Sequence, residues 1–307
     1  MSEKLRHRPI SAFIKDPRNT TQWLVFHILS KRIKNDKKYL SILYFATFWK
    51  KMHWKNPKTF NEKLNWLKIY GRNDLYTELA DKYEVKKHVA EIIGKEYVVE
   101  NYGVYDRWED INFEDLPDKY VIKCTHDSGG AYVCSKSTNS DLNQVRRYIE
   151  HALSIHNFKF CREWPYKNIP HRIIVDRYLN DGTGEGLRDF KFWCFNGVPT
   201  FMYMTVKSNS VFENFYDMNY KPIMIDHKFP RHKPEFDKPE AFDEMKLLAS
   251  KLSAGIPFVR IDFFYVDGHI YFGEYTFFDW GGMRPFGGNW DKELGKYINL
   301  PINKTMK

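Results

Sequence analysis

The sequence predicts an α+β fold, in which a helical N-terminal region precedes a larger region of antiparallel strands. Up to about residue 70, apolar residues recur at the three- and four-residue spacing of amphipathic helices. From about residue 97, short runs rich in aromatic and β-branched residues alternate with turns and further helices. Two turns, Asn196-Gly197 and Asp267-Gly268, each separate two such runs and are strong signals for β-hairpins.

Local signals predict where the helices begin and end. The apolar-rich run 39–49 lies between lysines and is too short to span a membrane, so we expect a core helix there. Thr59 and Glu62 have the spacing of a capping box, which predicts a helix over 60–70. Further helices are expected over 76–93, which Gly94 ends, and over 141–155 and 242–252. The runs that predict strands are 120–124, 172–179, 190–195, 199–206, 258–266 and 270–277.

The composition favours a folded cytoplasmic protein. Of the 307 residues, 43% are apolar, and the net charge of +9 suits nucleotides, acidic glycans or anionic lipid as partners. Nucleic acid is not an expected partner, because no zinc-finger spacing, RNP-like motif or basic heptad region occurs. The 4 cysteines show no C-x-x-C spacing and the N-terminus has no apolar stretch, which indicates a reducing compartment. No transmembrane segment is expected; peripheral contact of run 39–49 with the inner face of the membrane is an alternative.

The first candidate site residue is Lys123, near the end of the predicted 120–124 strand. The loop that follows contains Ser128, Gly129 and Gly130, whose backbone N–H groups would lie beside the lysine ammonium. That combination suits a polyphosphate, although the order of residues is not that of a Walker A motif. Taken alone, the loop is better explained as an ordinary strand that ends in a tight turn.

A second lysine, Lys191, lies within a predicted strand. Strand alternation places it on one face with Asp189 and Trp193. A lysine among aromatic residues usually lies at an exposed sheet edge, and otherwise contacts an anion in a cleft. We favour the cleft only in combination with Lys123, because the two lysines could then bind the same polyphosphate.

Asp262 and Glu274 are carboxylates inside the otherwise apolar strands of the second hairpin. A buried carboxylate needs a partner, and magnesium favours one or two carboxylates together with phosphate oxygens. A strict two-residue turn at 267–268 would place the two side chains on opposite faces. The metal hypothesis therefore requires a three-residue loop over 266–268, which makes them diagonal neighbours on one face. The alternative is a structural ion pair in which Arg260 neutralises one carboxylate.

These parts form an ordered set of strand lysine, glycine loop, second lysine and a hairpin with Arg-x-Asp and Glu. The segments involved are Asn56–Leu64, Asp81–Lys86, Lys123–Gly130, Asp189–Lys191, Arg260–Asp262, Gly273–Glu274 and Trp290–Gly295. Together they resemble the ATP-grasp superfamily, and within it the TupA-like proteins of teichuronopeptide biosynthesis. The resemblance covers about residues 50–300, which is most of the chain.

The resemblance implies an ATP-grasp fold, in which two α+β subdomains with antiparallel sheets clamp ATP. A helical region over 1–72 would precede a catalytic region over 73–300 and a tail over 301–307. Within the catalytic region we expect a lead-in part over 73–118, a first ATP-binding lobe over 119–180 and a second lobe with the metal site over 181–300.

The resemblance also implies roles for single residues. Lys123, Lys191 and the loop of Ser128, Gly129 and Gly130 would contact the nucleotide phosphates. The strand with Asp176, Arg177 and Tyr178 would lie by the adenine. Asp262 and Glu274 would hold Mg²⁺, while Thr276 stands where the superfamily usually has a further asparagine ligand, so that Asp279 or a water would have to supply that oxygen. Arg260 is a candidate for binding the substrate carboxylate or its oxyanion, and Arg284 for contact with the acceptor. His126 is a candidate for accepting the amine proton, although a histidine beside such a loop more often only hydrogen-bonds the turn.

The expected activity is an ATP-dependent carboxylate–amine ligase that acts through an acylphosphate in the synthesis of a bacterial surface polysaccharide. The carboxylate substrate would be a uronic acid or an amino acid, and the amine substrate an amino acid or an amino sugar. The acceptor could also be a lipid-linked glycan. A glycosyltransferase of the same pathway is an alternative, although Arg260-Ile261-Asp262 lacks the first aspartate of a D-x-D pair. A glycan kinase and a non-catalytic basic module that binds anionic glycan or membrane are further alternatives.

Overall fold

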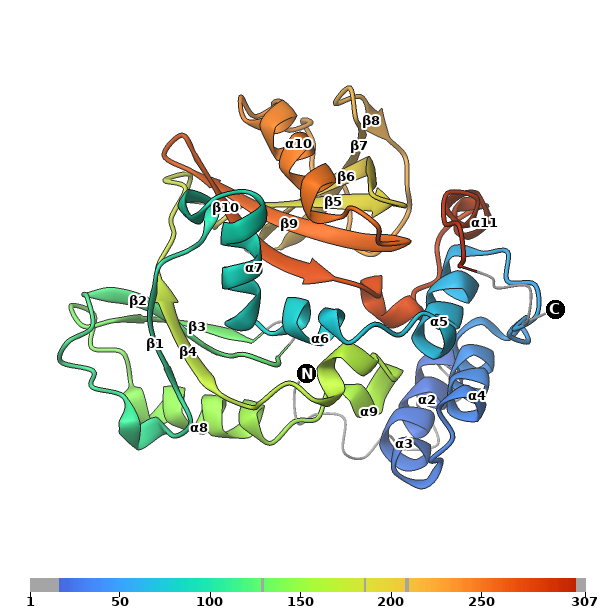
Figure 1. Cartoon of the computed structure of the whole chain (residues 1–307), viewed down its shortest axis with the longest axis horizontal. Coiled ribbons are helices and arrows are strands. Elements are labelled where there is room, and N and C mark those ends of the chain that lie inside the picture. The colour runs from blue at the N-terminus through green and yellow to red at the C-terminus, as the bar shows by residue number, and fades with distance from the viewer. Residues whose placement is uncertain (1–16, 128–129, 185, 208–209, 302–307) are drawn as a thin grey trace.

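The computed structural model of the chain describes residues 17–127, 130–184, 186–207 and 210–301. Two antiparallel sheets form its centre, and helices lie at the N-terminus, between the sheets and on their outer faces (Figure 1). The predicted α+β class is thereby confirmed. Short 3₁₀ turns connect the larger elements at η3 (Lys95–Tyr97), η4 (Trp108–Asp110), η5 (Trp164–Lys167) and η6 (Asp279–Gly282).

The N-terminal helices are α2 (Pro17–Leu24), the π-helical turn η2 (Val25–Leu29), α3 (Ser30–Arg32), α4 (Asp36–Phe48) and α5 (Phe60–Tyr70). The capping box at Thr59 and Glu62 is present, and α5 begins and ends where the sequence predicts. Helix α4 contains most of the apolar run 39–49 and ends at Trp49, whose φ of 56° is left-handed. No helix within the described ranges has both the length and the apolar character needed to cross a membrane.

The single helix expected over 76–93 is wrong, because the structure has two helices there, α6 (Leu75–Ala80) and α7 (Glu84–Ile92). Asp81 separates them in an extended conformation with φ −75° and ψ 122°. Its carboxylate accepts the backbone N–H groups of Tyr83 at 2.7 Å and Glu84 at 3.2 Å, which satisfies donors at the start of α7. The end of α7 is as predicted, since Gly94 follows with a φ of 118°.

The smaller sheet has the strand order β1-β4-β2-β3. Its strands are β1 (Asn101–Tyr105), β2 (Lys119–Cys124), β3 (Ala131–Ser135) and β4 (Ile173–Arg177). The chain between β3 and β4 forms α8 (Leu142–Leu153) and α9 (Phe158–Cys161), and α8 contributes buried Val145 and Ile149 to the core of this sheet. Strand β1 comes from the segment expected to be a lead-in part, yet it pairs with β4.

The larger sheet has the order β10-β9-β5-β6-β7-β8. Its strands are β5 (Asp189–Phe195), β6 (Val198–Lys207), β7 (Val211–Asp217), β8 (Pro222–Ile223), β9 (Phe258–Val266) and β10 (His269–Thr276). Helix α10 (Phe242–Leu252) contacts β5, β6 and β9, and α11 (Trp290–Gly295) lies against α5. Both predicted hairpins are present: in each turn the Asn or Asp and the Gly have positive φ, as a type I′ turn requires.

The two sheets have separate apolar cores. One core joins the N-terminal helices to the larger sheet, where Phe60 stacks on Trp193 with ring centroids 5.4 Å apart. The other core lies between the smaller sheet and α8. The start of α7 contacts the smaller sheet through polar groups: Lys82 donates its backbone N–H to the Thr125 carbonyl at 3.0 Å, and Arg172 pairs with Asp81 at 3.0 Å. Helices α6 and α7 lie between the sheets in Figure 1.

Candidate active site

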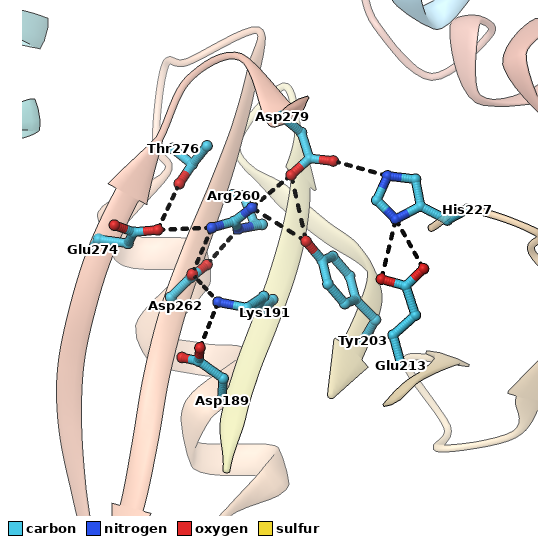
Figure 2. Close-up of polar contacts among 10 residues, drawn as sticks. All are labelled: Asp189, Lys191, Tyr203, Glu213, His227, Arg260, Asp262, Glu274, Thr276 and Asp279. Atoms are coloured by element: carbon cyan, nitrogen blue, oxygen red, sulfur yellow. Dashed lines mark hydrogen bonds and ion pairs between the residues drawn. The ribbon is translucent and has the colours of Figure 1, made fainter. Parts of the chain in front are cut away.

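Three neighbouring strands of the larger sheet, β5, β9 and the edge strand β10, bring Lys191, Asp262 and Glu274 side by side (Figure 2). Pairing of β5 with β9 places Lys191 opposite Asp262, and pairing of β9 with β10 places Glu274 opposite the same residue. Lys191 Nζ lies 2.5 Å from Asp262 Oδ2 and 2.9 Å from Asp189 Oδ2. The predicted common face of Asp189 and Lys191 is therefore confirmed.

The two carboxylates share a face for a reason other than the one predicted. The expected three-residue loop is wrong, since Val266 pairs with His269 across a two-residue turn. The register instead shifts by one residue between Phe272 and Glu274, which is a β-bulge at Gly273. A Cβ on Gly273 would lie 3.1 Å from the Asp262 carbonyl oxygen, so the close approach of the strands favours glycine.

Arg260 neutralises the carboxylates from the centre of the cluster. Its Nε and Nη2 donate to the two oxygens of Asp262, each at 2.7 Å, and Nη2 also donates to Glu274 Oε1 at 2.8 Å. Its Nη1 donates to Asp279 Oδ1 at 2.6 Å and to the Tyr203 hydroxyl at 3.2 Å. The ion pair considered as the alternative to a metal site is thus present, and Arg260 pairs with more carboxylates than that alternative supposed.

The cluster extends to His227 and Glu213, which no sequence pattern indicates. His227 Nε2 lies 3.4 Å from Asp279 Oδ2, and its Nδ1 lies 3.2 Å from Glu213 Oε1. All three side chains are at most 2% exposed. Histidine between two distant carboxylates has no local sequence pattern, because strand β7, the loop after β8 and the turn after β10 meet only in the fold (Figure 2).

The pKa shifts in the cluster result from burial and neighbouring charges acting against each other. Burial alone would lower the pKa of Lys191, but Asp189 and Asp262 outweigh burial and raise it. Burial would raise the pKa of Glu274, but Arg260, Lys82 and Lys191 outweigh it and lower this pKa to about 2. Burial would also lower the pKa of His227, and its carboxylate partners Asp279 and Glu213 raise it instead.

The donor set fits magnesium in chemistry, since carboxylates outnumber cations in the cluster and two of them share a face. Both oxygens of Asp262 are occupied by Arg260 and Lys191, whereas Glu274 has a partner only at Oε1 among the described residues. Thr276 donates its hydroxyl to that same Oε1 at 3.2 Å. Within the described ranges, no group of three or more His, Cys, Asp and Glu side chains is arranged to hold a metal ion.

On the smaller sheet, Lys123 of β2 pairs with Asp176 of β4. Lys123 Nζ lies 2.9 Å from Asp176 Oδ2, and Lys86 Nζ of α7 lies 3.1 Å from Oδ1. The Asp176 side chain is 4% exposed, and burial would raise its pKa, but the two lysines outweigh burial and lower it. Asp176 is therefore a buried counter-ion of the two lysines in this structure.

Lys82 connects the two charged groups. Its ammonium donates to the Asp127 carbonyl at the start of the predicted glycine loop. Burial lowers the pKa of Lys82, and the charges of Glu274 and Lys123 act on it from the two sheets. Lys82, Glu274 and Tyr166 also line a cavity of about 10 Å³, room for about one water molecule. The sequence contained the signal, because Lys82 and Lys86 have i,i+4 spacing in a segment that carries the resemblance, but no role was assigned to them.

Other predicted residues lie away from these groups. His126 is 1% exposed, and its Nε2 lies 3.3 Å and 3.2 Å from the carbonyls of Ala152 and Ile155. Burial, together with a stacked His171, lowers its pKa to about 4. These contacts favour a structural role for His126.

The remaining predictions are distributed as follows. Arg284 donates Nε to the His227 carbonyl at 2.9 Å, which places it beside the larger cluster. Gly130 is buried next to Asp127, and Ser128 and Gly129 lie outside the described residues. Arg177 is exposed at the end of β4, and the Tyr178 ring lies 5.9 Å from Lys119 Nζ.

Two antiparallel sheets, with lysines on one and a lysine, an arginine and paired carboxylates on the other, define a protein of the ATP-grasp fold. The chain belongs to the TupA-like ATPgrasp family, whose family model matches residues 62–299. The resemblance read from the sequence is thereby confirmed. No curated protein matches the chain.

Solved structures with a similar fold are distant. D-alanine–D-alanine ligase from Bacillus anthracis, complexed with ATP, is 17% identical with a TM-score of 0.39, covering 64% of this chain and 54% of that chain. D-alanine–D-alanine ligase from Helicobacter pylori is 13% identical with a TM-score of 0.44, and the match covers 80% of this chain and 68% of that chain. The ATP-grasp ligase PsnB, complexed with minimal precursor, Mg and ADP, is 10% identical with a TM-score of 0.38, and the match covers 87% of this chain and 64% of that chain. The chain spans about half the length of the Bacillus anthracis ligase, and the similarity concerns the fold alone.

Proposed function

We propose that the protein is an ATP-dependent carboxylate–amine ligase, which forms an amide C–N bond through an acylphosphate intermediate. The observation that carries the proposal is that charged groups from both sheets approach each other at Lys82. The charges of Lys123 and Glu274 both act on Lys82, and those of Arg260 and Lys191 act on Glu274. Such an arrangement suits a polyphosphate held between the sheets.

Ligation through an acylphosphate would use the many charged side chains of the candidate active site. A carboxylate does not accept an amine directly, because the oxygen that must leave is a poor leaving group. Transfer of the γ-phosphoryl group to the carboxylate releases ADP and forms an acylphosphate. The amine then attacks the acyl carbon, phosphate leaves, and the amine loses a proton. The first transfer depends mainly on positioning and charge neutralisation, which cationic side chains supply.

In this proposal Lys123 and Lys191 bind the nucleotide phosphates, together with the loop of Ser128, Gly129 and Gly130. The strand 176–178 lies by the adenine. Arg260 binds the substrate carboxylate or the oxyanion that forms from it, and Arg284 contacts the acceptor. We give His126 no chemical step, because its ring is buried against backbone carbonyls.

Magnesium is the expected cofactor, and Asp262 and Glu274 would hold it, with Thr276 and Asp279 as their neighbours. When bound, the ion would neutralise charge on the phosphates. Glu274 is the better exposed ligand, since 35% of its side chain is exposed against 1% for Asp262. Burial raises the pKa of Asp262 despite Arg260 and Lys191, whereas these two cations, with Lys82, lower the pKa of Glu274 to about 2.

The proposed pathway is the synthesis of a bacterial surface polysaccharide such as a capsule, an exopolysaccharide or a teichuronopeptide-like polymer. This pathway rests on the resemblance to the TupA-like proteins of teichuronopeptide biosynthesis. The substrates would be a uronic acid or amino acid and an amino acid or amino sugar, with a lipid-linked glycan as one form of acceptor. The enzyme would act in the cytoplasm, and at the inner face of the membrane if the acceptor is a lipid-linked glycan.

The test is a reaction with ATP, magnesium and a panel of uronic acids, amino acids and amino sugars, with products identified by mass spectrometry. We expect ADP, phosphate and an amide. A product that keeps the phosphate would identify a kinase, and consumption of a UDP-sugar without ATP would identify a glycosyltransferase. Either result overturns the ligase proposal.

Lys123→Ala is the matched test of the site. Loss of this cation should lower ADP formation on the order of a hundredfold or more, because it would stabilise phosphate charge directly. Asp176 keeps Lys86 as a partner, so the fold should persist and can be checked by thermal unfolding. Lys95→Ala, at an exposed lysine outside the two charged groups, is the control. Undiminished ADP formation in Lys123→Ala would exclude this lysine from the mechanism.

A further inference from the structure

A large cavity lies outside the two charged groups, between the N-terminal helices and the C-terminal segment. Its volume is about 990 Å³, which is at the upper end of ordinary ligand pockets. The walls are Lys37 in the first turn of α4, the second half of α4, the segment 50–59, the start of α5, and residues 285–292 up to the start of α11. These elements share the apolar core of the larger sheet, so the walls of the cavity are held in place by core packing.

The cavity wall is strongly basic. Its cationic side chains are Lys37, Lys50, Lys51, Lys55, Lys58 and Lys292, with His53 beside them. Among the described residues, the structure gives Lys50, Lys51, Lys55, Lys58 and Lys292 no ion pair, whereas most buried lysines of the candidate active site are paired. Lysines that face a common space without counter-ions attract an anionic ligand, and their mutual repulsion falls when one binds.

The two acidic residues in the wall do not neutralise these lysines. Glu62 Oε2 accepts the backbone N–H groups of Lys58 at 2.7 Å and Thr59 at 3.1 Å, and Oε1 lies 2.6 Å from His53 Nδ1. Asp291 Oδ1 accepts the backbone and side-chain N–H groups of Asn61, both at 2.9 Å. Both carboxylates fix the start of α5, and because six lysines line the cavity against these two carboxylates, its net charge is positive.

Aromatic rings complete the wall. Tyr44, Phe48, Trp54 and Phe286 all line the cavity, and Tyr44 and Phe48 lie with ring centroids 4.4 Å apart. Trp54 is oriented by a hydrogen bond from its Nε1 to the Ser41 hydroxyl at 2.8 Å. Flat apolar rings between cations suit a ligand with apolar C–H faces and charged edges. A saccharide that carries carboxylates has both features, whereas an extended peptide of acidic residues has no such face.

We propose that this cavity binds an acidic oligosaccharide, such as a short chain of hexuronic acid residues. A concave wall with aromatic rings favours a chain of sugars over a flat membrane surface. The inference goes beyond the ligase activity, because it depends only on the residues of the cavity and not on the nucleotide. The segment 279–288 lies between the two regions, since Asp279 contacts Arg260 while Phe286 lines the cavity.

Binding is tested without ATP by isothermal calorimetry, with tetragalacturonate as the probe and maltotetraose as its uncharged counterpart. We expect the wild-type protein to bind tetragalacturonate and not maltotetraose. In the triple variant Lys51→Gln, Lys55→Gln, Lys58→Gln, the affinity should fall on the order of tenfold, because each exposed cation contributes modestly. The control variant Lys95→Gln, Lys221→Gln, Lys251→Gln loses the same charge from exposed positions outside the cavity and should bind as the wild type does.

A second measurement locates the ligand. Acetylation of lysines, followed by mass spectrometry, should show protection of Lys50, Lys51, Lys55 and Lys58 by tetragalacturonate. The proposal is overturned if tetragalacturonate does not bind, if the cavity triple variant binds it unchanged, or if pentaglutamate or phosphatidylglycerol vesicles compete for these lysines more strongly. Because ADP formation is not part of this experiment, its failure leaves the ligase proposal intact, and a failed ligase assay leaves the binding result intact.

Discussion

Replacing Glu274 with glutamine tests the electrostatic balance of the candidate active site. The Glu274 carboxylate has a pKa of about 2, against an ordinary value of 4.5, because Arg260, Lys82 and Lys191 together outweigh the effect of burial. A shift of this size would correspond to about 3 kcal/mol of stability in a site without water. Since 35% of the Glu274 side chain is exposed, screening reduces the expected loss in Glu274→Gln to about 1–2 kcal/mol at pH 7.

The pH dependence of stability shows whether the Glu274 carboxylate stabilises the fold in its charged form. A carboxylate whose pKa is lowered by folding stabilises the protein above its unfolded pKa of 4.5, and this contribution is lost as the pH falls toward about 2. The free energies of unfolding of the wild type and the variant, measured in urea, should therefore differ most at pH 7. The difference should shrink progressively below pH 4.5, because Glu274 then becomes protonated in the unfolded wild type before it does so in the folded protein. The same variant should form no ADP.

The matched control is Glu91→Gln, which removes an equal charge from a side chain that is 63% exposed and lies 4.0 Å from Lys87, its one ion-pair partner among the described residues. It should leave both stability and ADP formation unchanged. If Glu274→Gln unfolds with the wild-type free energy at pH 7, the reasoning about Arg260 and its carboxylates is wrong. If it forms ADP at the wild-type rate, Glu274 is not part of the mechanism.

Two further outcomes are expected. Thr59→Ala removes the hydroxyl that accepts the Glu62 N–H at 3.3 Å in the capping box of α5, and should lower the free energy of unfolding by about 1 kcal/mol in urea; an unchanged value would show that the cap does not stabilise this helix. Burial raises the pKa of Glu163 to about 7 despite nearby Lys68, so the wild type should lose about 2–3 kcal/mol of stability as the pH rises from 4.5 to 7. Glu163→Gln should lack this loss, and a parallel pH profile in both proteins would contradict it.

The elements that the sequence predicted well have local causes. The capping box at Thr59 and Glu62 and the two type I′ turns depend on residues close together in the chain, and the structure has all of them. Gly94 likewise ends α7 with a positive φ. The order of the strand lysine, glycine loop, second lysine and paired carboxylates along the chain also predicted the family, because that order can be seen in the sequence itself.

Other features depend on contacts between distant segments. The bulge at Gly273 arises where β10 pairs with β9, and a turn sequence does not determine a register shift several residues away. The break at Asp81 depends on capping by its carboxylate and on Arg172, 91 residues further along the chain. His227 enters the site because its neighbours Glu213 and Asp279 are brought to it by the fold. Tertiary contacts of this kind override local periodicity, which is why one helix was expected where two exist.

The separate cores of the two sheets make a hinged motion inexpensive. When two parts share one apolar core, moving them apart exposes apolar surface at about 25 cal/mol per Å². Here the start of α7 meets the smaller sheet through ion pairs and hydrogen bonds such as that between Arg172 and Asp81, and water can replace these contacts at a small net cost. Moving the smaller sheet and α8 relative to the larger sheet should therefore expose little apolar surface, and an anionic ligand bound by both Lys123 and Lys191 would oppose that movement.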